Sequence, residues 1–390
     1  MTSSRLGVVV ALGTTQTLAF GSTYYLPAIL AAPMAETLGL GVGWVYAAFS
    51  IALLVSGVLG PVVGSRIDRL GGRDVLAASS LIFALGLGLL AATSGPSLLV
   101  LAWLLIGVGM AMGLYDAGFA TLAGIYGREA RAPITGITLI AGFASTVAWP
   151  LTTLLEQSVG WRGACVFWAL VHLLLCLPIN RWLVPRGTQK LPEVIQGAPL
   201  RTRQPGELRA MLALGFVFAV SWFVSTAYAA HLPGLLLTAG LTPAMALFAA
   251  TLVGPAQVAA RLVEFSLLRR YHPLVSARLA TLAHPIGAAA LLAFGAPAAV
   301  LFTVLHSAGN GILTIAKGTL PLALFGPVGY GLRQGLLTAP SRFAQAAAPF
   351  LMTLAIEHLG LGVLAVSGGL LLLACLALFA VPRSLGPPTG

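Results

Sequence analysis

Long apolar runs separated by short polar segments make up almost the whole chain. Each run approaches or exceeds the ~20 residues that a helix needs to cross a membrane. The pattern therefore predicts an all-α membrane protein with about 12 transmembrane helices. The runs are 6–32, 43–64, 75–92, 98–126, 132–155, 162–184, 208–237, 243–268, 277–294, 297–324, 332–356 and 362–381.

The longest polar interval, 185–207, is rich in proline, glycine and basic residues, and it divides the runs six and six. We expect an N-terminal bundle over 1–184, a cytoplasmic linker over 185–207 and a C-terminal bundle over 208–390. An internal repeat supports this division, because Phe143-Ala144 in the fifth run matches Phe343-Ala344 in the eleventh. Two related halves predict a pseudo-symmetric pair of bundles that move around a central site.

Composition agrees with a membrane protein and excludes a soluble one. Of the 390 residues 58% are hydrophobic and only 8% are charged. The net charge of +11 could indicate nucleic-acid binding, but most of the 21 Lys and Arg residues fall in alternate loops or near the termini. This positive-inside pattern predicts a multi-pass protein of the inner (cytoplasmic) membrane with both termini in the cytoplasm and no nucleic-acid partner.

The charged segment 64–73 between the second and third runs contains a motif. It resembles the G-x-x-x-D-R-x-G-R-R loop of major facilitator superfamily transporters, although Gly72 stands where the family usually has a basic residue. The resemblance implies that helices one, four, seven and ten line a cavity, while two, five, eight and eleven form a moving interface. The matching residues are Gly64, Asp68, Arg69, Gly71 and Arg73.

These motif residues are candidates for gating. The carboxylate of Asp68 can meet the positive N-terminal end of the eleventh helix, 331–335, when the cytoplasmic side is closed. The alternative is that Asp68 only neutralises neighbouring arginines. A second gating candidate is the pair Arg261 and Glu264, which lie three residues apart in the eighth run and can pair with each other; the alternative for this pair is substrate binding.

Ionisable residues inside apolar runs are costly unless they face a cavity or a partner. Asp116 in the fourth run and Lys317 in the tenth occupy nearly the same position in the repeat, so we expect them to face one another. Asp116 is the candidate for proton coupling, the alternative being a permanent ion pair. Lys317 is the candidate for binding an anionic group, with Asn310 as a hydrogen-bonding neighbour on the same helix face.

Further candidates complete the predicted binding site. Arg342 in the eleventh run suits a carboxylate or phosphate, or else braces the interface. His306 shares the face of Lys317, either as a packing residue or as a proton relay. Aromatic side chains at corresponding places in the first and seventh runs are expected to close over substrate, or else to anchor the helices at the membrane surface; they are Tyr24, Tyr228 and His231.

These observations predict a secondary transporter of a small organic anion that works by alternating access, as a proton-coupled symporter or antiporter. The buried charges sum to +1, which favours an anion. The alternative is a proton-driven efflux carrier for amphipathic drugs or cations. No catalytic motif is present, so we expect no enzyme activity, no metal and no cofactor, and a monomer in the lipid bilayer.

Overall fold

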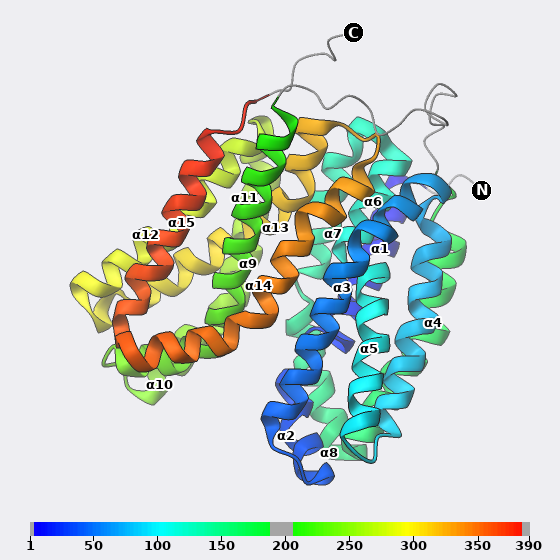
Figure 1. Cartoon of the computed structure of the whole chain (residues 1–390), viewed down its shortest axis with the longest axis horizontal. Coiled ribbons are helices and arrows are strands. Elements are labelled where there is room, and N and C mark those ends of the chain that lie inside the picture. Colours follow the sequence, from blue (N-terminus) through cyan, green and yellow to red (C-terminus); the bar gives the residue numbers. More distant parts are fainter. Residues whose placement is uncertain (1–3, 188–205, 384–390) are drawn as a thin grey trace. The chain divides into compact units, whose positions relative to one another are not determined.

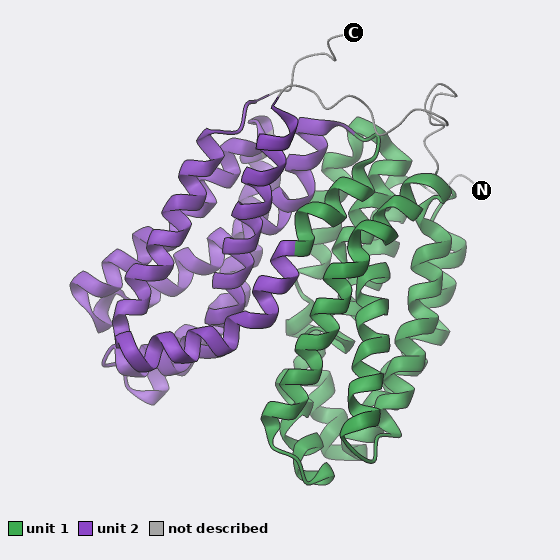
Figure 2. Cartoon of the chain, viewed as in Figure 1, with its two compact units in different colours: residues 1–191, 327–339 green, residues 192–326, 340–390 purple. Residues whose placement is uncertain are grey.

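Helices joined by short connections make up the part of the chain that the structure describes (Figure 1). The computed structural model describes residues 4–187 and 206–383, and no strand occurs within these residues. Two compact units are present (Figure 2): unit 1 comprises 1–191 and 327–339, and unit 2 comprises 192–326 and 340–390. The division falls inside one helix, α14 (Tyr330–Leu359), whose first turns pack in unit 1.

Unit 1 is built from eight helices in addition to the start of α14. Within it α3 and α4 both pack on α5, and α1 packs on α7 and α8. The helices are α1 (Arg5–Ser22), α2 (Pro27–Leu38), α3 (Val42–Leu70), α4 (Gly72–Ala91), α5 (Pro96–Gly113), α6 (Tyr115–Tyr126), α7 (Arg131–Ala141) and α8 (Ala144–Val171), followed by π-helical turns at His172–Cys176 and Ile179–Leu183.

Unit 2 is organised around α12, which packs on α13 and α15, while α15 also packs on α9. The rest of α14 belongs to this unit. The other helices are α9 (Glu207–Thr238), α10 (Pro243–Thr251), α11 (Val253–Ser266), α12 (Pro273–Phe294), α13 (Ala299–Phe325) and α15 (Val363–Phe379).

Length and hydropathy make these helices fit to span a membrane. Across 4–187 and 206–383, nine helical segments are long and apolar enough to cross one. Two of the nine, of 88 and 50 residues, are long enough for more than one crossing, so the number twelve stays a prediction. Large apolar side chains such as Leu174 and Phe294 are exposed on the surface, as expected where lipid replaces water.

The segment 64–73 is not the extended turn that the glycines and charges predict. Instead α3 continues to Leu70, and a single residue, Gly71, connects it to α4. Gly71 has a φ of 83°, which favours glycine. The prediction of a loop was wrong because charge at a membrane surface does not end a helix, whereas a glycine that readily adopts positive φ does.

Several predicted single helices are interrupted. The first run divides before Pro27, because proline lacks the N–H that would continue the helical hydrogen bonds. The fourth run divides at Leu114, whose backbone is extended between α5 and α6. The eighth run divides into α10 and α11. The predicted linker lies mostly outside the described residues, so the division into six-helix halves stays a prediction.

The predicted boundary between the fifth and sixth runs is a sharp kink in α8 at Gly160, where φ is 72°. The two residues that follow hold this kink in place. Trp161 donates from Nε1 to Thr37 Oγ1 at 3.0 Å, and Arg162 donates to the Thr93 carbonyl at 2.8 Å. The guanidinium also stacks on the Trp161 ring, 4.2 Å from its centroid. This short segment therefore ties α8 to α2 and to the end of α4.

Candidate functional site

Asp68 binds the N-terminus of α14 within unit 1. Its two carboxylate oxygens accept hydrogen bonds from the backbone N–H groups of Gly331 at 2.8 Å and Leu332 at 2.9 Å. Backbone N–H groups in the first turn of a helix have no intrahelical partner, and the helix dipole favours negative charge there. The contact expected from the sequence is therefore present, and the gating role of Asp68 stays a prediction.

Glycines allow α3 and α14 to approach until their backbones touch. A Cβ placed on Gly64 would lie 2.0 Å from the Gly331 carbonyl oxygen, and one placed on Gly335 would lie 2.5 Å from the Gly60 carbonyl. Each helix thus presents two glycines four residues apart, the spacing that permits close helix packing in membranes. Any larger residue at these positions would separate the helices and remove the bonds to Asp68.

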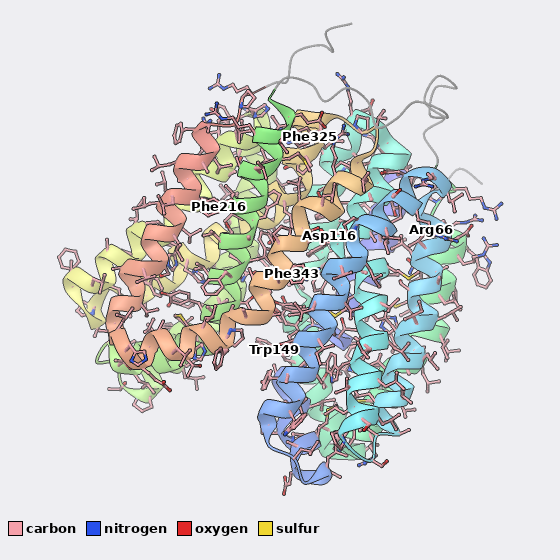
Figure 3. The ribbon with its side chains drawn as sticks, in the orientation of Figure 1. Arg66, Asp116, Trp149, Phe216, Phe325 and Phe343 are labelled. Atoms are coloured by element: carbon pink, nitrogen blue, oxygen red, sulfur yellow. The ribbon has the colours of Figure 1, made fainter. Side chains whose placement is uncertain are left out.

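The other motif residues surround this contact. Arg69 donates to Ser65 Oγ one turn earlier on α3, at 2.9 Å. Arg73 lies 3.5 Å from Asp74, which also approaches Arg181 at 3.8 Å. Arg69 and Arg73 therefore stabilise the helix ends on either side of Gly71. Arg66, also on α3, is labelled in Figure 3.

Replacing Asp68 with asparagine is expected to loosen the start of α14. Asparagine keeps one acceptor oxygen but loses the negative charge, which costs about 1–2 kcal/mol at a helix N-terminus. Spin labels at Arg66 and Val328 should report a single short distance in the native protein and an added longer population in Asp68→Asn. Asp74→Asn, which alters an exposed carboxylate nearby, is the control, and an unchanged distance in both variants would contradict the predicted role.

Asp116 lies in the first turn of α6, directly after the break at Leu114 (labelled in Figure 3). Its carboxylate accepts a hydrogen bond from Gln334 Nε2 at 3.0 Å, and Gln334 is fully buried on α14. Asp68 and Asp116, from two different helices, thus both bind the first turns of α14.

The break between α5 and α6 is stabilised by Gln16 from α1. The amides of Ala117 and Gly118 both bond to the Leu114 carbonyl, so the Gly113 carbonyl lacks its usual helical partner. Gln16 donates from Nε2 to this carbonyl at 2.7 Å. Interrupted helices inside membranes are tolerated where such groups are satisfied or line a cavity. The polar residue at position 16 therefore maintains the geometry around Asp116.

Aromatic rings lie beside Asp116. The ring of Tyr115 is 4.6 Å from that of Phe20 on α1. Phe20 in turn contacts Tyr24 and Tyr25, which lie between α1 and α2, with centroid distances of 6.1 and 6.4 Å. Tyr24 is half-buried, so it belongs to a surface-accessible aromatic cluster, and its substrate-binding role stays a prediction.

In unit 2, Lys317 is buried on α13 with 3% of its surface exposed. Its Nζ lies 5.0 Å from the centroid of the Trp222 ring on α9, a cation–π contact. Asn310 lies two turns earlier on α13 and is half-buried. The predicted face-to-face arrangement of Lys317 with Asp116 joins residues of different units and stays a prediction.

Arg342 is the second buried cation of unit 2. It lies on α14 and donates from Nη1 to Gln345 Oε1 at 3.2 Å. Gln345 is itself buried and donates from Nε2 to Thr226 Oγ1 on α9, also at 3.2 Å. The amide of Gln345 therefore connects the guanidinium of Arg342 to α9.

The second gating candidate is buried on α11. Arg261 and Glu264 are 5% and 2% exposed. Arg261 donates from Nη2 to Gln257 Oε1 at 3.3 Å, one turn earlier on the same helix. Its Nε and Nη1 atoms have no hydrogen-bond partner among the described residues. The structure shows no direct bond from Arg261 to Glu264, and the gating role of the two residues stays a prediction.

The two aromatic candidates of α9 have different surroundings. Tyr228 is buried inside unit 2, where its hydroxyl lies 2.8 Å from Ser367 Oγ on α15. His231 is half-buried, and its Nε2 donates to the Pro349 carbonyl on α14 at 3.1 Å. A role of Tyr228 in binding substrate would require a conformation that exposes it, and both roles stay predictions.

An all-helical protein with long apolar helices and ionised side chains inside them defines a class, the polytopic membrane transporters of small solutes. The sequence profile of the Major Facilitator Superfamily matches residues 12–304. The chain belongs to this superfamily and is a multi-pass membrane protein.

Two curated proteins are similar in sequence. One is the "Uncharacterized 38 kDa protein in 23S RNA operon" of Thermoproteus tenax, 33% identical over 370 residues, which cover 88% of this chain and 93% of that protein. The other is the 3-(3-hydroxy-phenyl)propionate transporter of Escherichia coli (strain K12), 30% identical over 253 residues, which cover 63% of this chain and 60% of that protein.

Solved structures share the fold at lower identity. The human organic anion transporter MFSD10 (TETRAN) has a TM-score of 0.72 and 18% identity, and the match covers 97% of this chain and all of that chain. The proton:xylose symporter XylE has a TM-score of 0.68 and 16% identity, covering 97% of this chain and 94% of that one. These similarities show the fold and do not define the solute.

Proposed function

We propose that this protein is a proton-coupled secondary transporter of a small organic anion in the inner membrane, with both termini in the cytoplasm. The observation that carries the proposal is the burial of two cations, Lys317 and Arg342, inside unit 2. Buried cations are expensive inside a membrane unless they serve a partner or a solute. A carboxylate that binds between such groups would offset this cost.

Two relatives support the choice of an anion. MFSD10 is described as an organic anion transporter, and the propionate relative is described by a solute that carries a carboxylate. Asp116 is the proposed proton site, because it is an ionisable group at a helix break inside unit 1 and its partner Gln334 can stabilise it in either protonation state. A glutamine amide donates to a carboxylate through Nε2 and accepts from a carboxylic acid through Oε1.

Uptake into proteoliposomes tests the anion proposal. The probes are 3-(3-hydroxyphenyl)propionate, its neutral primary amide and xylose, each with an imposed pH gradient of either sign. We expect gradient-dependent movement of the acid and no movement of the amide above empty liposomes, because only the acid offers a charge to Lys317 and Arg342. Equal transport of acid and amide, or transport of xylose alone, would contradict the anion proposal.

An efflux carrier for amphipathic cations is the second candidate. The aromatic cluster of Phe20, Tyr24, Tyr25 and Tyr115 beside the carboxylate of Asp116 favours it, because aromatic faces and a carboxylate both attract organic cations. The same liposomes loaded with ethidium distinguish the two candidates. Movement of ethidium driven by the pH gradient, without movement of the acid, would indicate that the transported solute is a cation and not an anion.

A further inference from the structure

A buried hydrogen-bonded network connects four helices of unit 2. His284 on α12 and His306 on α13 face each other, with their Nδ1 atoms 2.9 Å apart. The other nitrogen of His284, Nε2, lies 3.0 Å from Ser367 Oγ on α15. The Tyr228 hydroxyl on α9 lies 2.8 Å from the same Ser367 oxygen. His284, His306, Ser367 and Tyr228 are all buried.

The geometry determines where the hydrogens lie when the network is neutral. Ser367 Oγ lies 3.2 Å from the Leu364 carbonyl, and when it donates its hydrogen there it accepts from His284 Nε2 and from Tyr228. The single hydrogen of a neutral His284 is then on Nε2, and its Nδ1 is an acceptor. His306 then donates from Nδ1, which leaves a lone pair on His306 Nε2.

This arrangement can take up one proton and no more. A proton that adds to His306 Nε2 converts this ring to an imidazolium, and its Nδ1–H continues to donate to His284, so no hydrogen bond is broken. A second proton would have to bind His284 Nδ1, where it would face the N–H of His306. The two rings therefore act as one site with coupled titration.

We propose that the His284–His306 pair is a binding site for one proton, separate from Asp116 and independent of the solute proposed above. Among the described residues neither ring is bonded to a carboxylate, so an imidazolium in this conformation would lack a counter-charge. Phe302 stacks on His306, with ring centroids 6.0 Å apart. Proton uptake therefore favours a conformation in which His306 gains water, and protonation shifts the conformational equilibrium.

The surroundings contain little else that titrates. Among the described residues neither imidazole forms an ion pair, and the Tyr228 phenol is the titratable neighbour that contacts both rings. Arg278 on α12 is occupied by the Leu378 carbonyl at 2.9 Å. Lys317 is eleven residues further along α13, about 16 Å at a rise of ~1.5 Å per residue. The proton affinity of the pair therefore depends on the two rings themselves and on Ser367.

Histidine ¹⁵N NMR of the full chain in lipid nanodiscs tests the proposal. As the pH is lowered from about 8 to about 4, we expect His306 to become doubly protonated while His284 keeps one hydrogen. Proton uptake over this titration should fall by one per protein, and not by two, in the double variant His284→Gln/His306→Gln, whereas each single variant keeps one ring that can bind the proton. The spectrum of the native protein shows the protonation states of His306 and His284 even if a variant fails to fold.

The matched control is His172→Gln in unit 1, since His172 is also buried and lies 2.8 Å from a serine oxygen, that of Ser22, but has no second histidine beside it. This replacement should leave the signals of the pair unchanged. The proposal is overturned if both rings of the pair stay neutral throughout the range, or if the two single variants lose separate protons that add in the double variant.

Discussion

Asp116→Asn is expected to abolish the dependence of solute accumulation on a pH gradient while leaving exchange of solute across the membrane intact. Asparagine cannot bind or release a proton, but its amide oxygen still accepts the hydrogen bond that Gln334 donates to Asp116 at 3.0 Å. The geometry at the start of α6 is therefore preserved while the titration is lost. The measurement is accumulation of the transported probe in proteoliposomes with and without an imposed pH gradient.

Two further variants make this experiment specific. Asp116→Glu retains an ionisable group and should recover part of the gradient dependence. Asp74→Asn removes a carboxylate whose side chain is 63% exposed and should leave coupling unchanged. Full gradient dependence in Asp116→Asn would remove this residue from proton coupling and would leave the histidine pair of unit 2 as the site to test next.

Lys317→Met is expected to weaken binding of 3-(3-hydroxyphenyl)propionate by about 30- to 150-fold in Kd. Loss of one charge-assisted hydrogen bond at a buried site costs about 2–3 kcal/mol, which corresponds to that factor. Methionine fills a similar volume against Trp222, so the packing of α13 on α9 is maintained. Isothermal titration of the purified protein measures the Kd directly.

Lys317→Arg should bind the same acid within about tenfold of the native protein, because it keeps the charge but changes the direction of its donors. Arg278→Met removes another cation of unit 2, one that stacks on Phe379, 4.1 Å from the ring centroid, and should have no effect on binding. Native affinity in Lys317→Met would exclude Lys317 from anion binding and would shift the assignment to Arg342.

The sequence predicted the fold class well because membrane insertion leaves strong signals in hydropathy and in the distribution of charge. It also predicted the contact between Asp68 and the start of α14. A carboxylate at a helix end and the N-terminus of another helix can both be recognised in the amino-acid sequence. The helix breaks at Pro27 and Leu114 were missed. The second of these has no local signal, because the apolar pattern continues through it.

The polar partners of the site were also missed. Gln16 and Gln334 lie among other polar residues, and nothing in their neighbourhood shows that one supports a broken helix and the other binds Asp116. His284 next to Pro285 gives no indication of a partner 22 residues away. An uncharged polar residue in a long apolar run was the signal that could have found all three, since lipid does not satisfy such groups.

The meeting of bare backbones at Gly64 and Gly331 implies that the start of α14 is either attached or detached, with no intermediate position. Side chains at an ordinary helix interface can change rotamer to fill a small separation, but glycines have nothing with which to do so. A separation of even 1 Å would forfeit a large part of the van der Waals attraction and stretch both amide bonds to Asp68 together. We therefore expect this interface to open cooperatively.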